Sequence, residues 1–239
     1  MHPKKFDFFE KENIKKLNLV NEFLKDGNMD GCVIGGNSVS ANYVNKVYGI
    51  TKNINYKLIQ NLSKYLRPTA DIDIVVIGEP NDFFYSNIRN YFGSESEIEM
   101  IGEEIDVFDL TKRSPYLSFY FTSYSENNNS INSVFYENVV KNSRNINISS
   151  KENKMHLDCA FSENLDTLLM KLISFPHRNS EKKQNDLRDI KLLNPIIDFL
   201  DLETLGIDLE QRGLATEMQK KDISKSLTFY NSYLSNNMI

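Results

Sequence analysis

The sequence predicts an α/β (α+β) protein in which a mixed β-sheet flanked by helices is followed by a mostly helical C-terminal region. Over residues 1–160, short apolar or alternating runs are separated by amphipathic segments with helical spacing. From residue 162 onward, leucines recur with a helical period instead. We therefore expect an α/β domain over residues 1–160 and a helical region over residues 161–239. A chain of 239 residues, 40% of them hydrophobic, is long enough to bury a sizeable core.

The overall charge argues against a simple non-specific DNA-binding protein. The formal net charge is −5 and the isoelectric point is about 5.4. Such a chain offers no global attraction for nucleic acid, so a nucleic-acid substrate would need a local basic surface.

The cysteines and the lack of targeting segments predict a cytoplasmic protein. Cys32 and Cys159 both lie in apolar runs without metal-ligand spacing, which favours two buried thiols over a disulfide. The first residues lack the apolar run of a signal peptide, and no apolar stretch reaches membrane-spanning length. We expect no membrane association.

The N-terminal third is expected to supply two helices and a short strand before the central strand. An amphipathic helix over about residues 8–25 ends at an Asp-Gly-Asn turn and packs behind the sheet. A strand over residues 31–34 ends in a Gly-Gly turn and leads into a helix from about Ser38 to Tyr48. An additional helix is predicted over residues 55–66.

The next elements alternate between strand and helix. A strand over residues 71–78 is followed by a turn and N-cap over residues 79–82 and then by a helix that Gly93 ends. Residues 94–101 and 103–110 form a predicted hairpin around Gly102. The aromatic run over residues 116–124 is a further strand, for which packing in the sheet core is favoured over base stacking. A short strand is expected over residues 145–148.

The strand over residues 71–78 carries two carboxylates where a buried strand should be apolar. Alternation places Asp71 and Asp73 on one face with Val75, while the opposite face is aliphatic. Two acids this close repel each other unless a cation lies between them, and a divalent metal is the natural candidate. The alternative is a strand end that simply reaches solvent.

The Gly-Gly turn is a candidate phosphate site. Gly35 and Gly36 would let backbone N–H groups approach a ligand closely, and the helix that follows begins near the hydroxyl of Ser38. The alternative is an ordinary strand-to-helix turn with Ser38 as the N-cap.

A third acid comes from the strand over residues 103–110. Asp106 shares one face of this strand with Glu104 and Phe108, whereas Ile105 and Val107 share the other. If this strand pairs directly beside the strand of Asp71 and Asp73, the three aspartates form one cluster.

The C-terminal region adds charged residues to helices. Leucines make a buried stripe over residues 163–173, with Lys171 at its flank, and the segment 175–178 breaks that helix. On the next helix, from about residue 184, Asp186 and Asp189 lie on one side. The alternative for these acids is a solvated face with surface ion pairs. A last helix over about residues 216–235 caps the region.

These motifs together resemble the active-site signature of the DNA polymerase beta-like nucleotidyltransferase superfamily. The resemblance rests on Gly35-Gly36-x-Ser38, on Arg67-x-Thr-x-Asp71-Ile-Asp73, and on the Ile-Asp-Val sequence around Asp106. The Arg-x-[Ser/Thr]-x-Asp-Ile-Asp form is similar to the AbiEii-type toxins of type IV toxin–antitoxin systems. The chain departs from the family pattern in the long segment over residues 49–66, which separates the Gly-Gly turn from the Asp pair.

The resemblance implies transfer of a nucleoside monophosphate from an NTP to an acceptor hydroxyl, with two Mg²⁺ ions as cofactors. Asp71, Asp73 and Asp106 would bind the metals and act in catalysis. The nucleotide would be bound by a second set of residues, which comprises Gly35, Gly36, Ser38, Arg67, Lys171, Asp186 and Asp189. As an AbiEii-like toxin, the protein would act on an RNA or tRNA acceptor and would have a cognate antitoxin.

Two other functions remain open from the sequence. An antibiotic nucleotidyltransferase resembles the same superfamily but modifies a small hydroxylated drug. A catalytically silent module on the same fold would bind a nucleotide or a partner protein without transfer.

Overall fold

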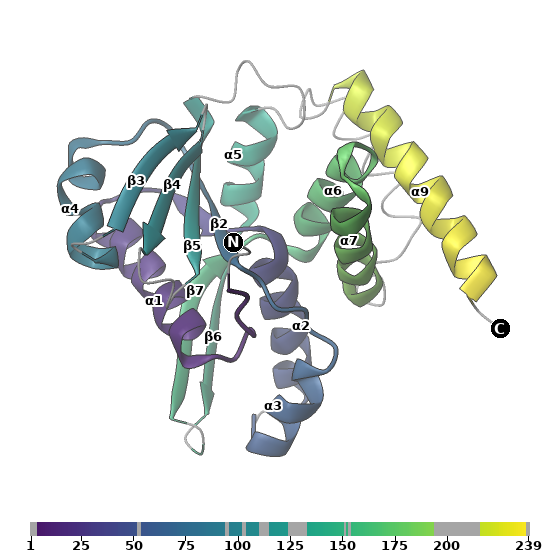
Figure 1. Ribbon diagram of the computed structural model, residues 1–239, viewed down its shortest axis with the longest axis horizontal. Helices are drawn as coiled ribbons and strands as arrows, with labels where there is room; N and C mark the ends of the chain where they lie inside the picture. The colour runs from purple at the N-terminus through teal and green to yellow at the C-terminus, as the bar shows by residue number, and fades with distance from the viewer. Residues whose placement is uncertain are drawn as a thin grey trace.

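The structure is a computed structural model that describes most of the chain (Figure 1). The described residues are 4–51, 54–93, 96–101, 104–109, 115–123, 133–150, 152, 154–193 and 216–237.

The described residues form a seven-stranded mixed sheet. The strands are β1 (Gly31–Val33), β2 (Asp71–Val76), β3 (Ser96–Ile101), β4 (Glu104–Asp109), β5 (Tyr116–Phe121), β6 (Arg144–Ser150) and β7 (Met155–Phe161). Their order across the sheet is β3-β4-β5-β2-β1-β7-β6. β2 runs parallel to β5, and β1 runs parallel to β7, whereas the other neighbours are antiparallel. The predicted mixed sheet is therefore confirmed.

Helices cover both faces of the sheet, as the fold-class prediction requires (Figure 1). They are α1 (Lys11–Asp26), α2 (Gly35–Thr51), α3 (Tyr56–Ser63), α4 (Asp82–Phe92), α5 (Ser133–Asn142), α6 (Asn164–Ser174), α7 (Ser180–Leu193) and α9 (Glu217–Asn237), with a 3-10 turn at Phe175–His177. α1 and α4 pack against one face in a first core. α5, α6 and α7 pack against the other face in a second core, and α9 lies outermost on that side.

The alternation of β2 explains why this strand can carry acids. Ile72, Ile74 and Val76 are fully buried in the first core. On the opposite face Val75 is buried in the second core, while Asp71 and Asp73 precede it. The two-faced character predicted for this strand is confirmed.

Several local predictions are confirmed by capping and turn contacts. The side chain of Asn81 accepts a hydrogen bond from the backbone N–H of Phe84, and Gly93 ends that helix. Asn55 caps the additional helix α3 in the same way through Leu58 N. Both cysteines are free and buried.

Other elements differ from the sequence-based expectation. β4 pairs with β5 and not with β2, so the expected neighbour of the acidic strand is wrong. α2 begins at Gly35, three residues before the expected start, because the two glycines themselves form its first turn. α7 likewise begins at Ser180 rather than near residue 184. The helix α5 and the strand β7 were not anticipated.

The helical C-terminal region shares a core with the sheet. Leu169 and Leu172 of α6 and Ile190 of α7 lie in the second core together with Cys32 and Val75 of the sheet. The strand β7 ends at Phe161, at the expected domain boundary, and the division into 1–160 and 161–239 stays a prediction. The turn region that Gly206 and Gly213 indicate in the sequence lies outside the described residues.

No helix among the described residues has both the length and the apolar character needed to cross a membrane.

Candidate functional site

A cleft of about 680 Å³ opens between the sheet and the C-terminal helices. This volume is within the range of small-molecule sites. Seven of the ten residues singled out from the sequence line it, namely Gly35, Gly36, Arg67, Asp71, Asp73, Lys171 and Asp186. Ser38, Asp106 and Asp189 are not among its lining residues.

Asp71 and Asp73 form the acidic floor of the cleft. They lie two residues apart on β2, so both side chains project from the same face. Burial, and then the neighbouring charge of Asp71, raise the pKa of Asp73 to about 7. Because burial and a like charge disfavour the ionised form of Asp73, a cation bound in the cleft would stabilise it.

The Gly-Gly turn lies directly against these charged groups. Gly35 has a φ of +69°, and a Cβ atom there would lie 2.4 Å from Oδ2 of Asp73. A Cβ atom on Gly36 would lie 2.5 Å from an Nη atom of Arg67. Only glycine lets the backbone approach this closely, so the turn places main-chain groups beside both a carboxylate and a guanidinium.

An asparagine that the sequence did not single out ties the turn to the acidic strand. Asn37 Nδ2 donates to Thr69 Oγ1 at 3.1 Å and to the carbonyl oxygen of Asp71 at 2.9 Å. Its Oδ1 accepts from Asn13 Nδ2 at 3.0 Å. Its position inside the Gly-Gly-x-Ser motif was the available signal, and its side chain fixes the start of β2.

Ser38 is fully buried and does not itself line the cleft. Its hydroxyl donates to the carbonyl oxygen of Ser162 and also lies 2.8 Å from Ser162 Oγ and 3.2 Å from Thr167 Oγ1. Because α2 begins at Gly35, Ser38 is not its N-cap either. In this structure Ser38 joins α2 to the start of α6.

Asp106 is separated from Asp71 and Asp73 by a whole strand. Ser118 of β5 lies opposite Asp73 on one side and opposite Asp106 on the other. Its hydroxyl donates to Asp106 Oδ1 at 2.6 Å. Burial raises the pKa of Asp106 to about 6, although the Ser118 hydrogen bond opposes this shift. The expected cluster of three neighbouring aspartates is therefore not formed, since β4 does not pair beside β2.

Glu104 of β4 and Glu181 of α7 are further acids that line the cleft. The hydroxyl of Tyr120 donates to Glu104 Oε1 at 2.9 Å and lies 3.5 Å from Asp73 Oδ1. A single phenol thus connects the two carboxylates across β5. The signal in the sequence was the shared strand face of Glu104 and Asp106, but register alone decides which of them reaches the cleft.

A buried ion cluster closes the opposite wall. Lys171 Nζ lies 2.9 Å from both Asp186 Oδ1 and Asp189 Oδ2. Arg67 Nε donates to Asp189 Oδ1 at 2.9 Å, and Arg67 Nη2 donates to Asp189 Oδ2 at 3.0 Å. Asp186 and Asp189 are only 3% and 1% exposed. They therefore do not lie on a solvated helix face, which was the alternative for these two acids.

The charges in this cluster stabilise one another. Burial alone would lower the pKa of Lys171, but Asp189 and Asp186 outweigh it and raise that pKa. Burial would likewise raise the pKa of Asp189, yet Lys171 and Arg67 hold it below its usual value. Lys171 and Asp189 therefore stay ionised at neutral pH.

The carboxylates fit a divalent cation in kind but not as a complete protein cage. No group of three or more acidic, histidine or cysteine side chains in the described part of the chain is arranged to hold a metal. Mg²⁺ is commonly bound by one or two carboxylates together with substrate phosphates and water. Asp71 and Asp73 match that requirement if a phosphate-bearing ligand supplies the other oxygens.

Comparison with known proteins gives a likeness in structure but no family. No protein-family model matches the chain, and no curated protein matches it. In structure the chain is similar to an antigenic nucleotidyltransferase-like protein from Paracoccidioides brasiliensis, with a TM-score of 0.48 and 14% sequence identity, over 95% of each chain. The function is therefore inferred from the residues of the cleft.

Proposed function

We propose that this protein is a metal-dependent nucleotidyltransferase that moves a nucleoside monophosphate from an NTP to an acceptor hydroxyl. The observation that carries the proposal is the meeting of three features in one cleft. Asp73 lies against the backbone of Gly35, Asp71 lines the cleft beside it, and the cations Arg67 and Lys171 line the same cavity. Paired carboxylates beside a glycine turn and fixed cations suit a magnesium nucleotide.

Asp71 and Asp73 would hold Mg²⁺ together with oxygens of the triphosphate. When bound, this ion would neutralise phosphate charge and lower the pKa of the attacking hydroxyl. A second ion would need Asp106 to reach past Ser118 from across β5. We assign Glu104 as the nearer candidate for that second role, because it lines the cleft and shares the Tyr120 hydroxyl with Asp73.

Lys171 and the Gly-Gly turn would orient the phosphates. An ammonium group has three donors, and two of those on Lys171 serve Asp186 and Asp189. The third would meet a phosphate oxygen, and the two aspartates would fix its direction. Arg67 would brace the start of β2 through Asp189 and add positive charge beside Gly36.

We extend the proposal to an RNA acceptor, tRNA included, and to a cognate antitoxin as partner. This extension rests on the resemblance to AbiEii-type toxins alone. The negative net charge means that such an RNA would be held by local cations at the cleft.

The test is incubation of the protein with Mg²⁺, each NTP labelled in its α-phosphate, and total RNA. Label should appear in RNA with the wild type and should be absent with Asp71→Asn and Asp73→Asn. Asp30→Asn is the matched control, since this aspartate is exposed and lies just before β1. Transfer that survives in Asp73→Asn would overturn the assignment of the metal site.

A second candidate function is nucleotide binding without transfer. It is favoured by one observation, namely that the residue directly beside Asp73 on β5 is Ser118 and not an acid. In both cases an NTP with Mg²⁺ should raise the melting temperature. Stabilisation without any labelled product, from any NTP, would favour the silent module.

A further inference from the structure

One end of the cleft is apolar and aromatic. Ile34, Met170, Tyr120 and Tyr136 all line it. Ile34 and Met170 belong to the second core, and the two tyrosines pack against that core. A surface of this kind does not attract phosphate, so it calls for another part of a ligand.

The register of the strands places this aromatic end beyond the acids. Tyr120 pairs with Val75, two residues past Asp73, whereas Arg67 lies four residues before Asp71. The acids therefore lie between a cationic end and an aromatic end. Asp71 and Val75 are separated by about 13 Å along the strand, at about 3.3 Å per residue.

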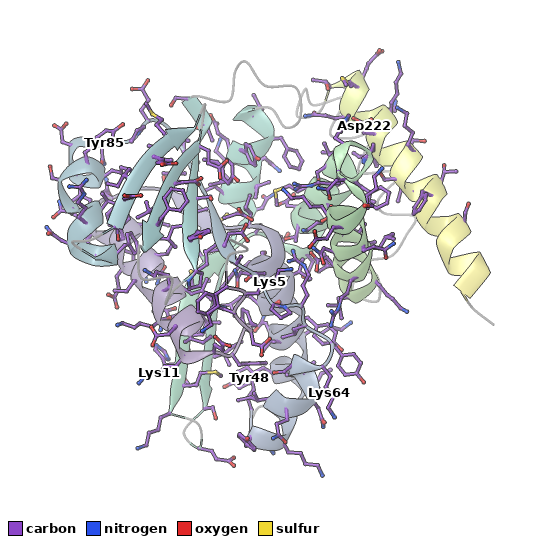
Figure 2. The ribbon with its side chains drawn as sticks, viewed as in Figure 1. Lys5, Lys11, Tyr48, Lys64, Tyr85 and Asp222 are labelled. Carbon is purple, nitrogen blue, oxygen red and sulfur yellow. The ribbon has the colours of Figure 1, made fainter. Side chains whose placement is uncertain are left out.

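The cationic end is extended by side chains from two other segments. Lys5 lies next to Phe6, which pairs with Thr69 just before β2, and its Nζ lies 3.7 Å from Glu181 Oε1 of α7. Figure 2 labels Lys5 between the sheet and the C-terminal helices. Arg178 lines the same cleft, with its Nε 3.6 Å from Asp186 Oδ2. Phosphates are thus favoured at this end.

The aromatic end presents two stacked rings. The centroids of Tyr120 and Tyr136 lie 6.4 Å apart with an angle of 22° between the ring planes. The Tyr120 hydroxyl donates to Glu104, so the Tyr120 ring, on which Tyr136 stacks, is held in place. Rings in offset stacks provide a flat face on which a further ring can bind.

We propose that the Tyr120–Tyr136 pair binds the nucleobase of the NTP, with Tyr136 as the stacking residue. This inference rests on the proposed function and adds the orientation of the nucleotide. The triphosphate lies toward Arg67 and Arg178, the α-phosphate lies at Asp71 and Asp73, and the base lies against Tyr136. Stacking on an aromatic side chain tolerates all four bases, because every base has a π-face.

The test is binding of 2-aminopurine riboside triphosphate with Mg²⁺ and no acceptor. The fluorescence of this base falls when it stacks, and the chain contains no tryptophan, so the probe can be excited where the protein does not absorb. Wild type and Tyr136→Phe should quench the probe. Tyr136→Leu removes the ring but keeps an apolar side chain, and it should lose the quenching and bind about tenfold more weakly.

Inorganic tripolyphosphate separates a lost base contact from a damaged fold. Its affinity should be the same in Tyr136→Leu and wild type, and should fall in Arg178→Ala. Unchanged quenching and affinity in Tyr136→Leu, with RNA labelling intact in the wild type, would overturn the base assignment and leave the proposed function standing. A wild type that binds no magnesium NTP at all would overturn both.

Discussion

Asp73 stands where its charge is costly for the fold. The residues on either side of it in β2, Ile72 and Ile74, are buried. Its carboxylate lies near Asp71 and against the backbone of Gly35. A residue selected for stability alone would be apolar or amide here, because a desolvated carboxylate beside a second carboxylate is disfavoured. The cost is understandable if a cation occupies the site during function.

This cost predicts a pH-dependent gain in stability for Asp73→Asn. The pKa of Asp73 is raised from 3.8 to about 7 in the folded protein, so the folded state holds this proton more tightly than the unfolded chain. The free energy of unfolding of the wild type should therefore fall as the pH rises from about 4 to about 7. At pH 8 Asp73→Asn should be more stable by about 1–3 kcal/mol, and the gain should vanish near pH 4.

Urea denaturation over this pH range, without added metal, measures the effect. Asp30→Asn serves as the control, because it removes an exposed carboxylate and should follow the wild type at each pH. Parallel pH profiles for wild type and Asp73→Asn would show that burial does not hold the proton on Asp73.

Glu104 and Asp106 share one face of β4, yet they should differ in their effect on transfer. Glu104 lines the cleft, whereas Asp106 is hydrogen-bonded by Ser118. We expect Glu104→Gln to lower the rate of nucleotidyl transfer by about 100-fold, and Asp106→Asn to lower it by less than about tenfold. Single-turnover rates at saturating NTP measure both, and the reverse order would restore Asp106 as the third acid.

The sequence allowed the Asp pair to be identified but not its third partner. Asp71 and Asp73 are two residues apart, so strand alternation alone puts them on one face. The place of Asp106 depended on which strand pairs with β2, and that pairing is a long-range choice. The burial of Ser38 was equally hidden, because it depends on contacts with Ser162 and Thr167, more than 120 residues away.

At the scale of elements, α7 holds the segment that leads into the acidic strand. Arg188 donates to the carbonyl oxygens of Lys64, Tyr65 and Leu66, at 3.1–3.3 Å. The next residue of α7, Asp189, pairs with Arg67. Two successive residues of one helix thus hold four successive residues between α3 and β2.

We expect Arg188→Ala to loosen the segment between α3 and β2 and to lower the rate of nucleotidyl transfer, although Arg188 does not line the cleft. The carbonyl groups of the three residues after α3 would lose their donor, and Arg67, the next residue, would be held by Asp189 alone. Hydrogen exchange should become faster in residues 64–69, and transfer should fall several-fold. Arg89→Ala on α4 is the matched control, because it replaces an exposed arginine on the other side of the sheet. Unchanged exchange in residues 64–69 would contradict this role of α7.

The elements themselves were largely predictable because their signals are local. Asn81 caps α4 within the predicted turn over residues 79–82, and β3 pairs with β4 in antiparallel fashion as the predicted hairpin requires. β7 was overlooked although Leu157, Cys159 and Phe161 alternate with less buried residues along it. That pattern is typical of a strand, and the intervening His156 and Asp158 obscured it.

For the molecule as a whole, the buried ion cluster is a charged link between the C-terminal helices and the sheet motif. Lys171 lies on α6, Asp186 and Asp189 lie on α7, and Arg67 precedes β2. Removing one member of a buried cluster leaves unpaired charges inside the protein, which is strongly destabilising.

Lys171→Met should therefore lower the free energy of unfolding by about 3–5 kcal/mol. Lys141→Met is the control, since Lys141 forms an exposed pair with Glu137 one turn away, and it should change stability by less than about 0.5 kcal/mol. Adding Asp186→Asn to Lys171→Met should recover part of the loss, because it removes one unpaired carboxylate. A loss no larger than that of the control would show that the cluster contributes little to the fold. Denaturant unfolding measures all three variants.

The most direct test of the central claim is the affinity of the cleft for a divalent ion in the presence of an NTP analogue that cannot be cleaved. Mn²⁺, followed by paramagnetic resonance, can replace Mg²⁺ in this measurement. We expect the complex of the wild type and the analogue to bind Mn²⁺ more tightly than the analogue alone. In Asp73→Asn the Mn²⁺ affinity of this complex should be at least tenfold lower than in the wild type. Equal Mn²⁺ affinity in wild type and Asp73→Asn would contradict the claim that Asp71 and Asp73 hold a metal–nucleotide complex.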